Sequence, residues 1–189
     1  MKSILINRHG DVDVLECKDI PEPDCASGRI KVKIKASAIN HLDIWVRNGL
    51  PGIDIPLPLI LGSDASGTIV EVGNEVKGYK KGDNVVIQPG TFSPMCKKAL
   101  EGYENYSKTY GILGETENGV QSEYVVLKPS NVYQMPEHLT FIESASMPLV
   151  FMTSYQMLIK RAKLKKNDNV LIYGGTSGVG SAAIQIAKD

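Results

Sequence analysis

The chain has 189 residues, of which 42% are hydrophobic and 22% charged, an ordinary composition for a soluble globular protein with room for one large domain or one domain and part of another. Basic and acidic residues number 21 each, so the formal net charge is zero and favours neither nucleic acid nor an anionic membrane surface as a partner. The sequence contains no membrane-spanning apolar run, no secretory signal and only three scattered cysteines, so we expect a cytoplasmic protein without a disulfide framework.

The first 136 residues have the pattern of a β-rich domain. Short apolar runs predict strands over residues 2–7, 12–17, 30–36, 67–72, 84–88 and 122–127. The first two runs flank residues 8–11 (Arg-His-Gly-Asp), which are typical of a hairpin turn. Gly, Asn and Asp punctuate the intervals between the other runs. Many short strands at this spacing suggest a closed or partly closed antiparallel barrel.

The run over residues 30–36 alternates between apolar side chains and lysines. Ile30, Val32 and Ile34 therefore share one face of the strand, which we expect to be buried. The opposite face is most simply a surface in contact with water, and its members are Lys31, Lys33 and Lys35.

A helical pattern begins after Pro136. Thr140 has the side chain of an N-cap residue, and Glu143 three positions later completes a capping-box pattern. The pattern continues towards Lys163, and Pro148 within it predicts either a kink or a division into two helices.

The last segment predicts a strand, a glycine-rich turn and a helix in succession. Residues 169–173 are a short apolar run typical of a buried parallel strand. Residues 174–180 (Gly-Gly-Thr-Ser-Gly-Val-Gly) form the turn, and apolar residues then recur at helical spacing. We expect residues 170–186 to be buried or covered by a partner, because a lone strand and helix expose an apolar edge and face.

This turn has the chemistry of a dinucleotide-phosphate site. Backbone N–H groups at the start of a helix, together with the helix dipole, favour an anion. Gly175, Gly178 and Gly180 match the G-x-x-G-x-G variant of the dinucleotide fingerprint, although a tight turn without a ligand is the alternative. The residue that discriminates between nicotinamide cofactors lies about 20 positions further on, past Asp189. The predicted cofactor-binding turn residues are Gly175, Thr176, Ser177, Gly178, Val179 and Gly180.

Six segments in a fixed order resemble the medium-chain dehydrogenase/reductase superfamily. They are residues 38–49, 58–67, 82–85, 114 with 119–124, 145–148 with 153–155, and 174–185. The resemblance implies a mainly β GroES-like barrel over residues 1–140, followed by linking helices and the opening βα unit of an α/β Rossmann fold over residues 141–189. Because members continue through the rest of the Rossmann sheet, the chain is interpreted as a fragment or a truncated product.

The resemblance also identifies the positions at which zinc-dependent relatives hold metal. The catalytic positions fall on Asn40, Ser63, Asp64 and Leu149, and the structural positions fall on Ser93, Cys96, Ala99 and Ser107. Asn, Ser and Leu do not replace the thiolate and imidazole ligands of zinc, and one thiolate of four does not close a structural site. We therefore expect a protein without zinc. A different zinc site using His41, Asp43 and Asp64 is the weaker alternative.

Zinc-free relatives use NADPH, with NADH as the alternative, to reduce a quinone, an enone or an aldehyde. Without a metal, hydrogen bonds must polarise the substrate oxygen. The resemblance makes Asn40 the candidate donor and Trp45 an aromatic wall, and it adds Ser63 and Asp64 to the catalytic set. It also places Thr153 near the nicotinamide. The imidazole of His41 makes that residue a candidate neighbour of the pyrophosphate or of a proton relay.

Each of these side chains also has a structural interpretation. Asn40 and His41 suit a turn, Trp45 suits the core, Asp64 suits a loop beside Ser63, and Thr153 suits a hydrogen bond to a helix carbonyl.

Two other functions stay open, namely a zinc-type alcohol dehydrogenase with atypical ligands, and a non-catalytic dinucleotide-binding module or inactive fragment. We expect residues 1–189 alone to bind NADPH weakly and to turn over nothing, because most of a Rossmann sheet is missing. The expected partners are a small-molecule substrate and further copies of the chain in a homodimer or homotetramer, with no nucleic acid and no membrane.

Overall fold

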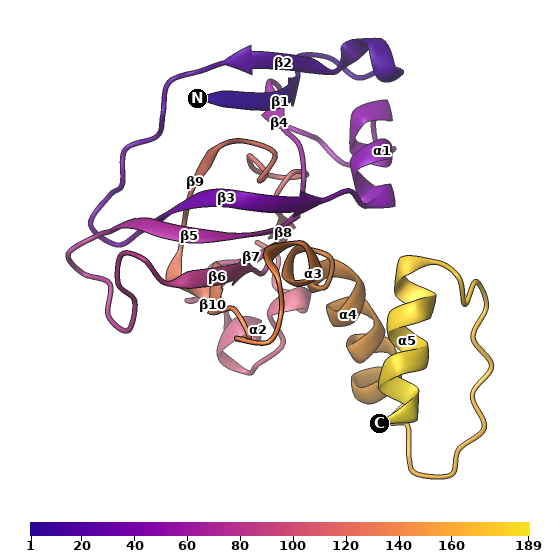
Figure 1. The fold of residues 1–189 in the computed structure, drawn as a ribbon. Helices are drawn as coiled ribbons and strands as arrows, with labels where there is room; N and C mark the ends of the chain where they lie inside the picture. The colour runs from indigo at the N-terminus through magenta and orange to yellow at the C-terminus, as the bar shows by residue number, and fades with distance from the viewer. The chain divides into compact units, whose positions relative to one another are not determined.

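The computed structural model describes residues 1–189 and divides them into two compact units, Met1–Ser146 and Met147–Asp189 (Figure 1). The strands of the first unit are β1 (Lys2–Ile6), β2 (Glu16–Asp19), β3 (Ile30–Ala38), β4 (Leu59–Ile60), β5 (Asp64–Val72), β6 (Asn84–Ile87), β7 (Gly90–Thr91), β8 (Gly111–Ile112), β9 (Tyr124–Leu127) and β10 (Val132–Gln134). Its α-helices are α1 (His41–Asn48), α2 (Lys97–Leu100) and α3 (Phe141–Ala145). The second unit contains α4 (Pro148–Tyr155), the π-helix Gln156–Arg161 and α5 (Gly178–Lys188). None of these helices combines the length and the hydropathy that crossing a membrane requires.

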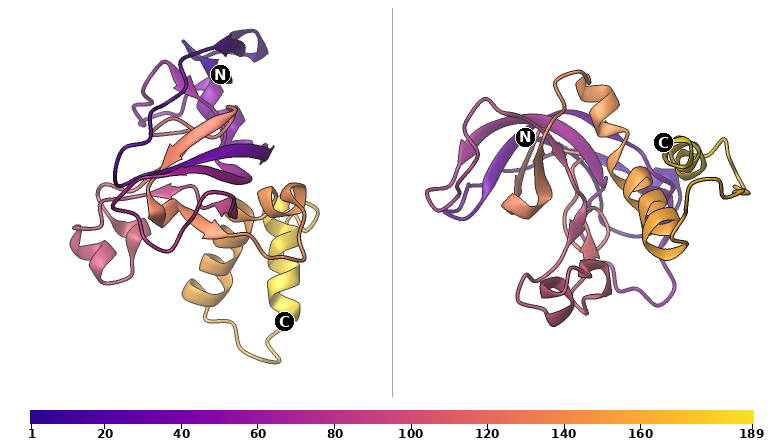
Figure 2. Two further views of the ribbon diagram at one scale, coloured as in Figure 1. Left: turned by 60° about the vertical axis from the view of Figure 1, so that its left-hand side comes forward. Right: turned by 90° about the horizontal axis from the view of Figure 1, so that it is seen from below.

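Three antiparallel sheets form the first unit. Their strand orders are β10-β6-β5-β3-β9, β2-β1-β4 and β7-β8. The two nine-residue strands β3 and β5 run side by side through the middle of the largest sheet (Figure 2). Its edge strands, β9 and β10, do not pair with each other, so of the two expected forms, closed and partly closed, the closed barrel is excluded.

Two apolar clusters make up the core of this unit. The larger one fills the large sheet with side chains that include Ile30, Val32, Ala65, Ile69, Val85, Ile87 and Leu127. The smaller one joins β1, β4 and α1 through Ile6, Val14, Val46, Ile55, Leu59 and Leu61. Because Val46 is fully buried, one face of α1 is anchored and the opposite face is left for other contacts.

The predicted hairpin at the start of the chain is confirmed, with a longer connection than expected. β1 pairs with β2 from Lys2 opposite Asp19 to Leu5 opposite Glu16. The Val12–Val14 segment, expected to begin the second strand, is a 3-10 turn. The Asp11 carboxylate accepts a hydrogen bond from the Val12 N–H at 2.7 Å, and this local cap favours the turn over the strand.

The lysine face of β3 is solvated at only two of its three positions. Lys33 and Lys35 are exposed, but Lys31 is 8% exposed. Its ammonium pairs with Glu22 and lies 5.6 Å from the centre of the Tyr124 ring on β9. The expectation of three solvated lysines is therefore wrong, because a neighbouring strand and the segment before β3 cover this one.

The helical predictions around residues 140–163 are confirmed. Thr140 caps α3, and its capping box with Glu143 is complete. Pro148 begins α4, so the proline divides the segment into two helices. In the second unit α4 packs against α5, where the Ser154 hydroxyl lies 2.8 Å from the carbonyl oxygen of Val179.

The segment before α5 differs from its prediction. α5 begins at Gly178 as expected, but residues 169–173 form no strand. Leu171 and Tyr173 are 78% and 89% exposed, whereas Gly180, Ala182 and Ala183 are buried, so the chain itself covers only part of the segment that we expect to be buried or covered by a partner. A parallel strand obtains its hydrogen bonds from neighbouring strands, and the second unit contains none.

Candidate functional site

The predicted donor, Asn40, is the N-cap residue of α1. Its Nδ2 atom donates a hydrogen bond to Oδ2 of Asp64, the first residue of β5, at 2.9 Å. Asp64 is only 1% exposed, whereas Asn40 is half-buried. The fold therefore brings together two predicted site residues that lie 24 positions apart in the chain.

A second carboxylate, Asp43, holds the backbone of Asn40. Its Oδ2 accepts the Asn40 N–H at 2.7 Å, and its own N–H donates to the Asn40 carbonyl at 3.0 Å. Asp43 is 6% exposed, and burial raises the pKa of its carboxyl, while hydrogen bonds from the backbone of Asn40 and Gly62 oppose that rise. This role of Asp43 was not predicted from the sequence, although the Asn-x-x-Asp spacing resembles a capping box and was the available signal.

Ser63 is fully buried and hydrogen-bonded inside the protein. Its Oγ donates to the Leu113 carbonyl at 2.9 Å. The loop around it is tight, because a Cβ on Gly119 would lie 2.1 Å from the carbonyl oxygen of Gly62. This geometry favours the structural interpretation, in which Ser63 anchors the loop that leads to Asp64.

Two aromatic side chains lie on the outward face of α1. The rings of His41 and Trp45 are tilted by 59°, with their centroids 5.1 Å apart. His41 is exposed, and Trp45 is 51% exposed. Trp45 is therefore not a core residue of this unit, and the pair offers a polarisable surface one turn from Asn40.

The donors at the catalytic zinc positions of relatives do not fit zinc. Asn40 offers an amide that is bonded to Asp64, and Ser63 offers a hydroxyl that is bonded to Leu113. Leu149, on α4, offers no donor atom. A single carboxylate does not make the tetrahedral nitrogen and sulfur set that zinc prefers. The structure gathers no three His, Cys, Asp or Glu side chains into a ligand cluster, and this includes His41, Asp43 and Asp64.

The lobe between β7 and β8 contains the other four metal positions of relatives. Cys96 precedes α2, and a hydrogen bond with the Ser107 side chain lowers the pKa of its thiol, helped by backbone N–H groups of Lys98 and Ala99. Cys96 and Ser107, two of the four positions, are therefore in contact with each other. Among them only Cys96 supplies sulfur, so the lobe lacks the ligands of a structural zinc site.

The glycine turn before α5 fits the phosphate of a dinucleotide. Ser177 is the N-cap, and its Oγ accepts the Gly180 N–H at 3.0 Å. Gly174 has a positive φ of 67°, and a Cβ on Gly180 would lie 2.1 Å from its carbonyl oxygen. The turn therefore packs closely on the first residues of the helix. The start of this eleven-residue helix is exposed at Ser177 and Gly178, and the N–H groups of a helix N-terminus favour an anion.

The predicted cofactor residues differ in exposure. Thr176, Ser177 and Gly178 are exposed, whereas Gly180 is buried and Val179 is half-buried. Thr153 is exposed on α4, in the second unit with the turn, while His41 belongs to the first unit.

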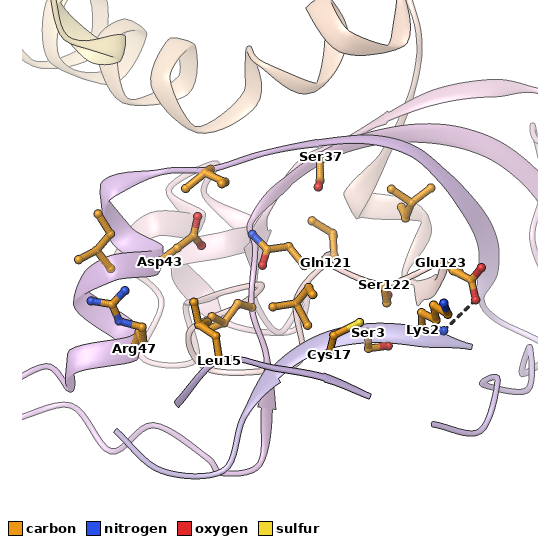
Figure 3. A pocket seen from close by; sticks show the side chains of 16 residues that line it. Lys2, Ser3, Leu15, Cys17, Ser37, Asp43, Arg47, Gln121, Ser122 and Glu123 are labelled. Atoms are coloured by element: carbon orange, nitrogen blue, oxygen red, sulfur yellow. Dashed lines mark hydrogen bonds between the residues drawn. The ribbon is translucent and has the colours of Figure 1, made fainter. Parts of the chain in front are cut away.

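The first unit also contains a groove of about 690 Å³ that sequence reasoning missed (Figure 3). Apolar side chains from β1, β3 and α1 line it, together with Asp43, Ser37 and Gln121. Oδ1 of Asp43 and Oγ of Ser3 are buried here without a hydrogen-bond partner. None of the predicted catalytic or cofactor-binding side chains lines this groove.

Comparison with known proteins gives a consistent set of relatives. Residues 26–137 match the alcohol dehydrogenase GroES-like domain. The chain is 36% identical to 2-methylene-furan-3-one reductase of Solanum lycopersicum over 190 aligned residues, which cover 100% of the chain and 44% of that protein. A crystal structure of an NAD-dependent alcohol dehydrogenase is 42% identical, with a TM-score of 0.95 over 100% of the chain and 55% of its own. A cobalt- and zinc-bound thermostable alcohol dehydrogenase from Pyrobaculum aerophilum is 27% identical, with a TM-score of 0.89 over 100% of the chain and 55% of its own. The chain thus spans about half the length of the relatives it matches.

Proposed function

Because the chain belongs to the medium-chain dehydrogenase/reductase superfamily through its alcohol dehydrogenase GroES-like domain, we propose that the whole protein is a zinc-independent, NADPH-dependent reductase of a quinone, an enone or an aldehyde. The observation that carries the proposal is the amide of Asn40, held by a buried carboxylate at a position where zinc relatives place a ligand. The tomato reductase supports the choice of an enone.

Within this proposal the side chains bind and orient the substrate. The reduced nicotinamide supplies a hydride when it is bound. Asn40 donates an N–H to the substrate oxygen, where negative charge develops. Trp45 covers the substrate with its ring, and His41 lies near the cofactor. The turn before α5 binds the pyrophosphate through the backbone N–H groups of Gly178 and Val179, because those of Ser177 and Gly180 are taken by the Gly174 carbonyl oxygen and Ser177 Oγ. The proton that completes the reduction comes from solvent.

The proposal is tested by NADPH oxidation in the whole protein with a naphthoquinone, a conjugated enone and an aldehyde, each repeated with NADH. We expect turnover after treatment with a zinc chelator, with a preference for NADPH. Replacing Asn40 by Ala should lower kcat about 10²-fold, the usual loss for one donor to a developing oxyanion. Absence of oxidation with all three substrates, or activity that requires stoichiometric zinc, would refute the proposal.

A second candidate, an alcohol dehydrogenase with atypical zinc ligands, is favoured by the likeness to dehydrogenase structures, one of which holds zinc. It requires bound zinc and NAD-linked alcohol oxidation, so metal analysis of the purified protein separates the two. A non-catalytic binding module would bind the dinucleotide but give no turnover in either assay. We also propose a cytoplasmic homodimer or homotetramer, which fractionation and light scattering would test.

A further inference from the structure

We infer that Asp43 and Asp64 are positioning residues that hold the amide of Asn40 in one orientation, so that Asn40 presents an N–H group to the substrate and not its carbonyl oxygen. The inference rests on the proposed role of Asn40 as the donor to the substrate oxygen. It restricts the site to substrates that offer a hydrogen-bond acceptor there.

The contact with Asp64 sets the rotation of the amide. A carboxylate only accepts hydrogen bonds, so the nitrogen of Asn40 must face Oδ2 of Asp64, as the 2.9 Å contact has it. Turning the amide over would place its oxygen, Oδ1 of Asn40, against Oδ2 of Asp64. Asp64 is only 1% exposed. Little water reaches that position to screen the repulsion, so the alternative orientation is strongly disfavoured.

The contact with Asp43 sets the position of the Asn40 backbone. The Asp43 carboxylate accepts the Asn40 N–H at 2.7 Å, and the Asp43 N–H returns a bond to the Asn40 carbonyl at 3.0 Å. The backbone of Gly62, in the loop leading to Asp64, also opposes the rise in the pKa of this carboxyl, so that loop lies beside it. The two hydrogen bonds between Asp43 and Asn40 fix Asn40 at the first turn of α1.

The chemical consequence is a fixed donor. Asn40 has two amide N–H bonds, and Asp64 accepts one of them. The second is left to bind an oxygen that carries lone pairs, such as a quinone or ketone oxygen. A site that holds its donor in place loses no orientation entropy when the substrate arrives, which is how a preorganised group assists a reaction.

The test exchanges the two partners. In the double variant Asn40→Asp with Asp64→Asn, the hydrogen bond is preserved but its donor and acceptor trade places. We expect the thermal stability of this swap to be close to that of the wild type, since the contact remains. Reduction of 1,4-naphthoquinone should nevertheless fall by about 10²-fold in kcat, because the substrate now meets a carboxylate. Recovery of wild-type kcat in the swap would overturn the inference.

A second measurement does not depend on turnover. Hydrogen exchange of the Asn40 side-chain amide, followed by NMR in the whole protein, should show one protected proton and one that exchanges faster. Asp64→Asn and Asp43→Ala should both reduce that protection, and Asp54→Ala, at an exposed aspartate, should not. Equal, fast exchange of both protons in the wild type would sink the inference even in an active reductase. If the wild type reduces nothing, the proposed function fails. The exchange measurement still decides whether the Asn40 amide is held in one orientation.

Discussion

At the scale of single residues, Gly180 is a position where the backbone leaves no room for a side chain. A Cβ there would lie 2.1 Å from the carbonyl oxygen of Gly174, and backbone atoms cannot move aside as a side chain can. At Gly175 an added Cβ meets only the end of the Ile184 side chain, at 3.3 Å. We therefore expect Gly180→Ala to disrupt the turn and lower the melting temperature of the second unit, while Gly175→Ala changes it little. Calorimetry of both variants decides the matter, and equal melting temperatures would contradict this packing argument.

The raised pKa of Asp43 makes the stability of the protein depend on pH. Burial raises the pKa of its carboxyl above the value of 3.8 for an unperturbed aspartate. The folded protein therefore keeps this proton at a pH where the unfolded chain has released it. As pH rises from about 4 through the raised pKa, the stability contributed by Asp43 falls, and above that pKa the loss is complete.

The variant Asp43→Asn cannot ionise and isolates this effect. We expect the free energy of unfolding of the wild type, minus that of Asp43→Asn, to decline between pH 4 and neutral pH. Urea denaturation at a series of pH values measures the difference, in which contributions from the other groups cancel. A difference that grows with pH would show that the native state favours the ionised form of Asp43.

At the scale of elements, α3 depends on its cap. The Thr140 Oγ1 accepts the Glu143 N–H at 3.3 Å, and the Glu143 carboxylate accepts the Thr140 N–H at 2.8 Å. The helix contacts β3 and β5, where the Ser66 hydroxyl donates to the Phe141 carbonyl at 2.6 Å. Thr140→Ala should lower the free energy of unfolding by about 1 kcal/mol, and Thr140→Ser should keep most of it. Denaturant titration of the pair tests the cap, and an equal loss in both would point to the lost methyl group as the cause.

At the scale of the whole molecule, apolar side chains gather in the irregular segment before α5. Val170, Leu171 and Tyr173 are 39%, 78% and 89% exposed. Contiguous apolar surface of this kind promotes association. We expect the 189-residue chain to bind a hydrophobic dye and to self-associate, and Leu171→Ser with Tyr173→Ser to reduce both. Ile142→Ser, at an isolated residue that is 77% exposed, is the matched control and should have little effect in light scattering.

Much of the fold was predictable because it depends on neighbours in the sequence. Thr140 caps a helix through Glu143 three residues away, so the spacing alone identifies it, whereas the capping role of Ser177 was not predicted. The strands of the first unit follow runs of apolar residues, and the match of residues 26–137 confirms the GroES-like prediction. The candidate site was located only in part, since Asn40 and Asp64 came from a resemblance and the role of Asp43 was missed.

What the sequence determined by itself is the set of local hydrogen bonds, the order of the elements and the membership of a superfamily. Tertiary structure decided the rest: the burial of Lys31 beneath Tyr124, the open sheet, the contact between Asn40 and Asp64, and the exposure of residues 169–173. The physical reason is the range of the interactions. A cap or a turn is completed within a few residues, whereas a strand, a buried charge or an oriented amide needs a partner from a distant part of the chain.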